Sequence, residues 1–329
     1  MNIFANRLRA EQLPDDPPIP IDEMVQGWRN QPPFQYIPTW VVWRVDGAQI
    51  VARAHVSWLD VPENRHLVEF KIMVLPEYRR QGWAKQLLPL IAETTRRENR
   101  HTMFVDTNER VPAGAAFMER LGACPGLAMH TNQLKIAELN RDLVRQWQER
   151  AHERAAGFGL GFWEDAYPEE DIHAIVELIQ VMNTEPRGSL EYEDERFTPE
   201  QLRQIEKSLF ARGNERRTTY AREIATGKFV GYTQVLWHPN RPQILQQLDT
   251  AVFPEYRNYG LGRWLKAAML DKVLREHPEI KFVRTGNADS NAAMLKINEE
   301  LGFKPYMSVT IWQVEIDQVE KYLMNHKNL

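Results

Sequence analysis

Residues 252–262, VFPEYRNYGLG, contain residue types and a spacing that are suited to anion binding. A β-branched and aromatic run ends at a proline, and Gly260 and Gly262 follow just before a helical stretch. Amide N–H groups at the start of a helix, together with the positive end of the helix dipole, bind anions such as phosphate. The loop lacks the Lys-Ser/Thr ending of a nucleoside-triphosphate site, so we expect a pyrophosphate without a metal ion.

Residues 74–84, VLPEYRRQGWA, carry a second version of this loop. Gly82 and Gly260 lie 178 residues apart, and Gly122 and Gly302, each after a helical stretch, lie 180 residues apart. The nearly constant spacing predicts two related domains in tandem. A tight strand-to-helix turn without a ligand is the alternative for either copy, and the repetition of the loop favours the ligand.

The elements that position these loops follow from the pattern of each copy. Two extended runs flank Asp46-Gly47 in the first copy and Thr226-Gly227 in the second, which is typical of β-hairpins. The next apolar run of each copy ends at a proline, and a helix of roughly 14 to 18 residues and a further strand follow. We therefore predict an α+β fold made twice, each copy a mixed, mostly antiparallel sheet flanked by helices.

The boundary between the two copies is predicted near residue 150. Residues 140–162 read as a charged amphipathic helix that ends in glycines. The GFGLGF stretch at its end resembles a dinucleotide loop, but such a loop must follow a buried strand, so helix termination and a linker are favoured. The predicted domains are residues 1–150 and 151–329.

The composition is that of a globular protein, with 329 residues, 43% hydrophobic and 26% charged. A formal net charge of −4 gives no basic field for nucleic acid. No apolar run reaches the roughly 20 residues that cross a bilayer, and the first residues lack a secretory signal, so we expect a cytoplasmic protein without a membrane partner. A single cysteine, Cys124, excludes an internal disulfide, and scattered histidines predict no metal site.

Both loops resemble the acetyl-coenzyme A (acetyl-CoA) signature of the GNAT superfamily of N-acetyltransferases, which reads Arg or Gln, two residues, Gly, one residue, then Gly or Ala. The matching residues are Arg257, Gly260 and Gly262 in the second copy, and Arg79, Gly82 and Ala84 in the first. Residues 285–305 are similar to the segment that contacts the cofactor in this superfamily, which marks Asn291. The first copy has Val111 at that position.

The resemblance implies a tandem, mycothiol synthase-like chain that moves an acetyl group from acetyl-CoA to a primary amine of a small molecule, by direct attack on the thioester. Tandem relatives often keep one working site and one altered copy, and the better-matching second domain is expected to be the main catalytic unit. The cofactor-binding residues that the resemblance implies are Ala251, Val252, Arg257, Asn258, Tyr259, Gly260, Leu261, Gly262, Arg263 and Asn291 in the second copy, and Val74, Arg79, Gln81, Gly82 and Ala84 in the first.

Acetyl transfer needs a base, because a primary amine has a pKa of about 10.4. Asp249 is the first choice, as a base or as the holder of a relay water, because an acid in the run QQL-TAV is costly unless it is paired or functional. Pairing with an arginine is the alternative. The first copy has Lys71 at this point, with Glu69 two residues earlier as a substitute base. A backbone N–H near Ala251 or Val252 would stabilise charge on the thioester oxygen.

Asn298 stands where many relatives have a tyrosine that protonates the leaving thiolate. Its amide can hydrogen-bond the sulfur or order a water, and we expect it to act in this way. The acidic run 189–197 is expected near the acceptor pocket, where Glu191 and Glu193 could attract a cationic amine such as an aminoglycoside, a polyamine or an amino sugar. A solvated loop is the alternative for this run.

Two other functions stay open at this point. One is an acetyl-CoA-binding pseudoenzyme or a structural tandem protein without transfer activity, and the other is the binding of a different anionic nucleotide. A protein amino terminus is a further possible acceptor. The oligomeric state is predicted as a monomer whose two copies mimic a dimer, or as a homodimer.

Overall fold

The computed structural model describes residues 1–47 and 49–326. Its helices are α1 (Asn2–Gln12), α2 (Ile21–Arg29), α3 (Trp83–Arg97), α4 (Pro112–Leu121), α5 (Arg141–Arg154), α6 (Ile172–Ile179), α7 (Pro199–Ala211), α8 (Leu261–Glu276), α9 (Ala292–Leu301) and α10 (Ile316–Asn325). Its strands are β1 (Gln35–Tyr36), β2 (Thr39–Trp43), β3 (Ile50–Leu59), β4 (Leu67–Val74), β5 (Thr102–Asn108), β6 (Cys124–Lys135), β7 (Phe158–Glu164), β8 (Glu215–Glu223), β9 (Phe229–Trp237), β10 (Ile244–Val252), β11 (Phe282–Ala288) and β12 (Lys304–Glu315).

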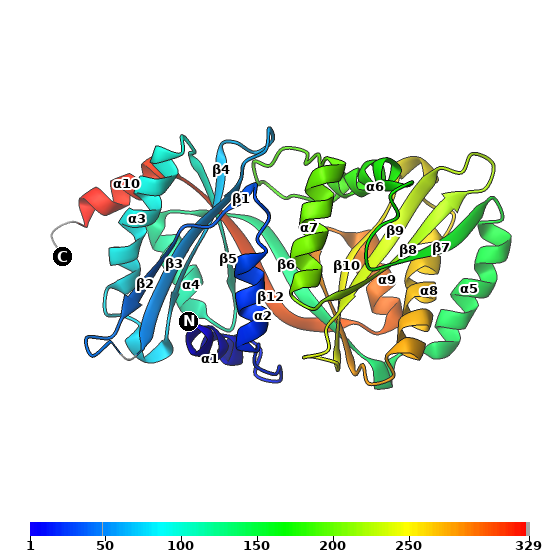
Figure 1. The fold of residues 1–329 in the computed structure, drawn as a ribbon, viewed down its shortest axis with the longest axis horizontal. Coiled ribbons are helices and arrows are strands. Elements are labelled where there is room, and N and C mark those ends of the chain that lie inside the picture. Colours follow the sequence, from blue (N-terminus) through cyan, green and yellow to red (C-terminus); the bar gives the residue numbers. More distant parts are fainter. Residues whose placement is uncertain (48, 327–329) are drawn as a thin grey trace.

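The strands form one continuous sheet in the order β1-β3-β4-β5-β12-β6-β11-β10-β9-β8-β7, with β2 paired to β3 (Figure 1). Most neighbours are antiparallel, and the parallel pairs are β4 with β5 and β10 with β11. The predicted α+β class, a mixed and mostly antiparallel sheet made twice, is confirmed. We call residues 1–123 the first half and residues 158–303 the second half.

Each parallel pair is short, which opens a wedge in the sheet. The pairing of β4 with β5 ends at Glu69, and the pairing of β10 with β11 ends at Gln246. Both strands of each pair continue for several residues beyond these points, toward the glycine loops. Backbone N–H and C=O groups along the wedge edges therefore lack a strand partner on that side.

The last strand of each copy completes the sheet of the other copy. Strand β12 lies between β5 and β6, and β6 lies between β12 and β11, so both cross the centre of the molecule (Figure 1). The helices that follow them are exchanged as well, because α10 packs on α3 and α5 packs on α8. Residue 150 lies within α5. The division at residue 150 stays a prediction, and strand pairing passes between the two parts in both directions.

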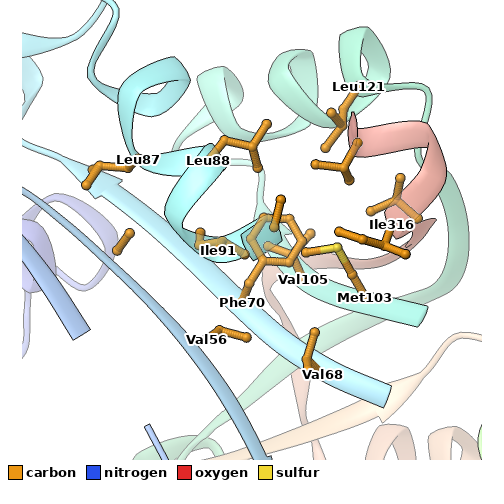
Figure 2. Close-up of a cluster of buried hydrophobic side chains, with 14 of the residues drawn as sticks. Val56, Val68, Phe70, Leu87, Leu88, Ile91, Met103, Val105, Leu121 and Ile316 are labelled. Carbon is orange, nitrogen blue, oxygen red and sulfur yellow. The ribbon is translucent and has the colours of Figure 1, made fainter. Parts of the chain in front are cut away.

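The core of the first half shows this exchange directly. Val68, Phe70 and Ile91 are at most 1% exposed, and Ile316 from α10 packs among them (Figure 2). A second cluster joins α5 to the other half, where Trp147 packs with residues of α8 and β11. The two halves therefore depend on each other for buried apolar surface, which is the main favourable term in folding.

The repeated Leu-Gly pairs end matching helices. Gly122 follows α4 with φ 76°, and Gly302 follows α9 with φ 96°. Both are in the left-handed region, where glycine avoids the steric cost that a side chain would bring, so they act as C-terminal caps.

Candidate functional site

The two glycine loops have the same backbone conformation. A single 3₁₀ turn at the Pro-Glu-Tyr sequence leads to Arg80 with φ 62° or Asn258 with φ 72°. Gly82 with φ 84° and Gly260 with φ 82° then precede α3 and α8. A Cβ added at Gly260 would meet no atom within 4 Å. The backbone angle, rather than an internal contact, therefore favours glycine here, and the space beside it is open.

Main-chain nitrogens in both loops are available to a ligand. The amides of Arg79 and Arg257 donate to the carbonyls of Pro76 and Pro254, at 3.3 and 3.2 Å. The six amides after each arginine donate no backbone or side-chain hydrogen bond outside the regular elements in the described part of the chain. Those at the start of a helix lack a partner within it. These amide N–H groups of each loop are therefore available to donate hydrogen bonds to a ligand.

The loop arginines brace the strand ends. Arg79 Nε donates to the carbonyl of Val74 at 3.1 Å and its guanidinium pairs with Glu11 of α1. Arg257 Nε donates to the carbonyl of Val252 at 3.0 Å. In both copies the side chain fixes where the strand ends, so the loop amides are held in place relative to the wedge.

One large cavity joins the loop to the wedge in the first half. It has a volume of about 490 Å³. Its lining runs from the loop at Arg79, Gly82 and Ala84, past Val74 of β4, to Asp106 of β5. It also reaches α4, since Val111 and Phe117 line it. Gln81 is absent from the lining, so its cofactor contact stays a prediction.

The second half has two smaller cavities that share no lining residue. One, of about 420 Å³, lies at Tyr259, Gly260 and Arg263, beside α5. The other, of about 290 Å³, lies in the wedge between β10 and β11 and is lined by Asp249 and Lys266. Tyr259, Gly260 and Arg263 are the predicted cofactor residues that line the loop cavity, and none of the predicted cofactor residues of this copy lines the wedge cavity.

A buried polar network borders the wedge cavity, since Lys266 and Asn287 line it. Lys266 of α8 is 2% exposed, and its Nζ donates to Asn298 Oδ1 at 2.7 Å. Asn298 Nδ2 donates in turn to Asn287 Oδ1 at 2.7 Å. Burial lowers the pKa of Lys266 to about 7. Both polar groups of the Asn298 amide are therefore occupied, and its predicted contact with a leaving sulfur stays a prediction.

The first half has apolar side chains at the same places. Leu88 lies six residues after Gly82, as Lys266 lies six residues after Gly260, and Met118 lies four residues before Gly122, as Asn298 does before Gly302. Leu88 is fully buried and Met118 is 3% exposed. The first half therefore has apolar residues at the positions of the polar pair, and Met118 lines its large cavity.

Asp249 lies in the wedge cavity of the second half. Its carboxylate accepts a hydrogen bond from the Tyr232 hydroxyl at 3.0 Å. Burial raises the pKa of Asp249, and the Tyr232 hydrogen bond partly opposes that rise. No ion pair of Asp249 with an arginine is found among the described residues. At a given pH, its side chain takes up a proton more readily than the side chain of an exposed aspartate does. The role of Asp249 as a base stays a prediction.

The strand ends offer one amide each to the wedge. Phe253 N donates to Val230 O on β9, and Leu75 N donates to Val51 O on β3. Because successive residues of a strand direct their N–H groups to opposite edges, the N–H groups of Val252 and Val74 face the wedge. Ala251, the other predicted donor, therefore directs its N–H toward β9.

Asn291 serves a local structural purpose. Its Oδ1 accepts from Met294 N at 3.2 Å and so caps α9, and its Nδ2 donates to Glu185. In the first half α4 starts instead with Pro112 after Val111, which suits the first position of a helix. The cofactor contact of Asn291 stays a prediction.

The acidic run lies against the first half rather than over the second. Glu191 N donates to Gln313 Oε1 at 2.9 Å, and Glu193 accepts from Asn64 N at 2.7 Å. Neither side chain lines a cavity described above. Their neighbours Tyr192 and Glu195 line a cavity of about 320 Å³. This cavity could not be located from the sequence, because it depends on how the strands are exchanged between the copies. The amine-binding role of Glu191 and Glu193 stays a prediction.

Other site types have no support in the described ranges. Within residues 1–47 and 49–326, no group of three His, Cys, Asp or Glu side chains is arranged to hold a metal ion. No helix in these ranges is both long and apolar enough to cross a bilayer. Cys124 is exposed and unpaired with another cysteine.

Comparison with solved structures finds other proteins with a similar fold. The chain is similar to a tandem GNAT protein from the clavulanic acid biosynthesis pathway, solved without acetyl-CoA, with 27% identity over 95% of this chain and 94% of that one, and a TM-score of 0.76. A GCN5-related N-acetyltransferase from Sphaerobacter thermophilus has 15% identity over 84% of this chain and 80% of that one, with a TM-score of 0.61.

A third similarity is to the GCN5-related glucosamine N-acetyltransferase region of a fungal multi-domain GH3 β-N-acetylglucosaminidase. It has 13% identity over 95% of this chain and 36% of that one, with a TM-score of 0.65. The two similarities below 25% identity show the fold alone. A search of curated proteins gave no match.

The family comparison matches both copies separately. The model of the acetyltransferase (GNAT) family matches residues 4–123 and residues 172–303. These ranges contain the two glycine loops and the two wedges. The chain therefore belongs to the acetyltransferase (GNAT) family.

Proposed function

We propose that this protein is an acetyl-CoA-dependent N-acetyltransferase that acetylates a primary amine of a small molecule, with the transfer site in the first half. The observation that carries the proposal is the cavity of about 490 Å³ that links the loop amides after Arg79 to the wedge at Val74. A pyrophosphate needs the amides and a pantetheine arm needs the apolar slot, so the residues present fit both parts of the cofactor.

The residues of the first half supply what the transfer requires. Acetyl-CoA supplies a thioester carbonyl that the amine attacks. The N–H of Val74 is aimed into the wedge, where it would stabilise negative charge on the carbonyl oxygen by roughly 3 kcal/mol. The arginine brace at Arg79 holds this strand end, so the donor needs little reorganisation.

Glu69 is the proposed base. Its carboxylate reaches the cavity of about 320 Å³ that adjoins the slot, and no hydrogen bond or ion pair of Glu69 is found within the described residues. Glu69 is exposed by its surface area, but desolvation by the protein atoms around its carboxylate, followed by the charge of Asp106, raises its pKa, which strengthens it as a proton acceptor. The ammonium gives one proton to Glu69, and the free amine forms the C–N bond. The C–S bond breaks with its electron pair on sulfur, which takes the second amine proton.

A second candidate function applies to the second half. The loop cavity and the wedge cavity of this half share no lining residue, and the polar Lys266–Asn298 network borders the wedge, which together favour a supporting, non-catalytic copy. The alternative proposal, made from the better-matching loop, is that the second half transfers the acetyl group with Asp249 as base. A cytoplasmic location and the choice between monomer and homodimer remain predictions.

Calorimetric titration with acetyl-CoA on two matched pairs of variants tests the proposal. Gly82→Asp and Gly260→Asp each place a charge in one loop, and Gly82→Asn and Gly260→Asn are controls, since Asn and Asp both tolerate positive φ. We expect Gly82→Asp to weaken binding at least tenfold, with a smaller effect of Gly82→Asn. Loss of binding in Gly260→Asp alone would move the transfer site to the second half.

Release of free thiol from acetyl-CoA separates an enzyme from a pseudoenzyme. With a panel of primary amines, the enzyme gives amine-dependent thiol release, and the pseudoenzyme binds acetyl-CoA and gives none. Equal affinity for adenine nucleotides that lack pantetheine would contradict the cofactor assignment, because such ligands leave the apolar slot unused.

A further inference from the structure

A cavity of about 320 Å³ lies between the two halves and adjoins the proposed cofactor slot. It shares Phe70, Lys71, Val105 and Asp106 with the slot, so the two spaces meet at the wedge. Its opposite wall comes from residues 182–195, which we call the seam segment. A molecule in this cavity would therefore touch both halves and would lie at the reacting end of the slot.

The seam segment is held firmly against β6. Ser189 N donates to Gly126 O at 2.9 Å. A Cβ added at Gly126 would come 2.2 Å from Leu190 Cδ2, and one added at Gly188 would come 2.1 Å from Gly126 O, so β6 and the segment touch closely. Asn183 binds both the N–H and the carbonyl of Glu195, at 3.0 and 2.9 Å. The wall is therefore a built surface, with fixed positions for its side chains.

The cavity has more negative than positive charge. Lys71 pairs with Asp106 at 2.6 Å, and Arg187 pairs with Asp194 at 2.8 Å. Glu69, Glu185 and Glu195 also line the cavity, and they have no ion-pair partner in residues 1–47 and 49–326. Neutral donors reach two of them, since Tyr192 donates to Glu195 and Asn291 donates to Glu185.

A buried nitrogen in the same wall also lacks a partner. His55 Nδ1 is inaccessible to solvent and makes no hydrogen bond within the described chain. Burial, followed by the charges of Arg53 and Lys71, lowers the pKa of His55 to about 4, so the ring is neutral at pH 7. The neutral ring adds no positive charge to the cavity, so the carboxylates without an ion-pair partner favour a ligand with several N–H donors.

We propose that this cavity is the acceptor site, and that it selects a compact amine with a second positive charge, which the seam segment binds through Glu195 and Tyr192. The inference rests on the proposed function, because Glu69 faces the reacting amine and Glu195 lies across the cavity. The charge of Glu195 is one of the causes that raise the pKa of Glu69, and a ligand with two positive charges would offset the negative charge of this cavity. The second half therefore contributes specificity to a reaction in the first half.

Three amines with five carbons each test the charge preference with the intact chain. Cadaverine has a second ammonium, pentylamine has a neutral tail and 5-aminopentanoate has an anionic tail. We expect kcat/KM from thiol release to fall in that order, by about tenfold at each step, as for one charge-assisted contact. Equal rates for the three amines would overturn the proposal.

Variants of the seam segment test whether Glu195 is the residue that binds the second positive charge of the amine. Glu195→Gln should raise KM for cadaverine about tenfold with kcat little changed, and should leave pentylamine unaffected. Glu170→Gln is the control, since Glu170 is an exposed glutamate of the second half that does not line the cavity. An unchanged cadaverine preference in Glu195→Gln would overturn the proposal. Absence of acetyl-CoA binding by the unmodified chain would instead defeat the proposed function, so calorimetry distinguishes the two failures. If Glu195→Gln does not fold, Tyr192→Phe provides the same comparison.

Discussion

Lys266 Nζ donates a hydrogen bond to Asn298 Oδ1 at 2.7 Å, whereas the first half has the apolar residues Leu88 and Met118 at the two equivalent positions. The Lys266–Asn298 pair makes these two buried positions polar in the second half, whereas they are apolar in the first half. It is the residue difference that most clearly separates the two wedges, and it can be changed without touching the loops.

Exchange of this pair has a predictable effect on stability. Lys266→Leu alone leaves the buried amide of Asn298 without its donor, so we expect a loss of about 1–3 kcal/mol of unfolding free energy. The double variant Lys266→Leu/Asn298→Met removes both polar groups and should recover most of that loss. Urea denaturation of the four proteins in the cycle measures this coupling, and strict additivity would contradict it.

The buried lysine also predicts a pH dependence. The pKa of Lys266 is lowered to about 7 in the folded chain and is about 10.4 when unfolded. Between these values the unfolded state binds more protons, so the free energy of unfolding rises with pH. Relative to the double variant, the unmodified chain should gain stability from pH 7 toward pH 10. A constant difference between the two over this range would show that the lysine has an ordinary pKa.

The brace at Arg79 predicts a link between loop order and cofactor affinity. Arg79→Lys loses the Nε hydrogen bond to Val74 and the planar fork toward Glu11. We expect a loss of about 1–2 kcal/mol in stability and weaker acetyl-CoA binding in calorimetry. Glu11→Gln is the control, since it keeps the strand-end hydrogen bond and should change affinity less.

The exchanged C-terminal helix should control the stability of the first half. Ile316 is 1% exposed and Met324 is 64% exposed on the same helix. Ile316→Ala should cost about 2–5 kcal/mol, because it leaves a cavity among first-half residues, whereas Met324→Ala should change little. Thermal unfolding followed by calorimetry checks this, and equal effects of the two variants would argue against the exchange.

Local features of the fold were predictable from the sequence. The proline before each loop, the glycines Gly82 and Gly260, and the capping glycines Gly122 and Gly302 all depend on backbone conformation, which short sequences encode. They gave the class of fold and the tandem repeat correctly.

Long-range pairing was not predictable in the same way. Strands β6 and β12 occupy equivalent places in the two copies, so nothing local decides which sheet each one joins. For that reason the sequence placed the acidic run near an acceptor pocket without indicating which half it faces, and Tyr192 and Glu195 line a cavity together with first-half residues. Lys266 was overlooked because a single lysine in a helix normally reaches solvent, and only comparison with Leu88 would have marked it.

The crossing of β6 and β12 has a consequence for biosynthesis. Strand β6 is already made when β11 leaves the ribosome, so the later copy can close as soon as its own residues emerge. The earlier copy waits for β12, which follows all the strands of the later copy. A nascent chain is therefore expected to acquire its first-half slot only after the second half has been made, which delays coenzyme capture until β12 has emerged.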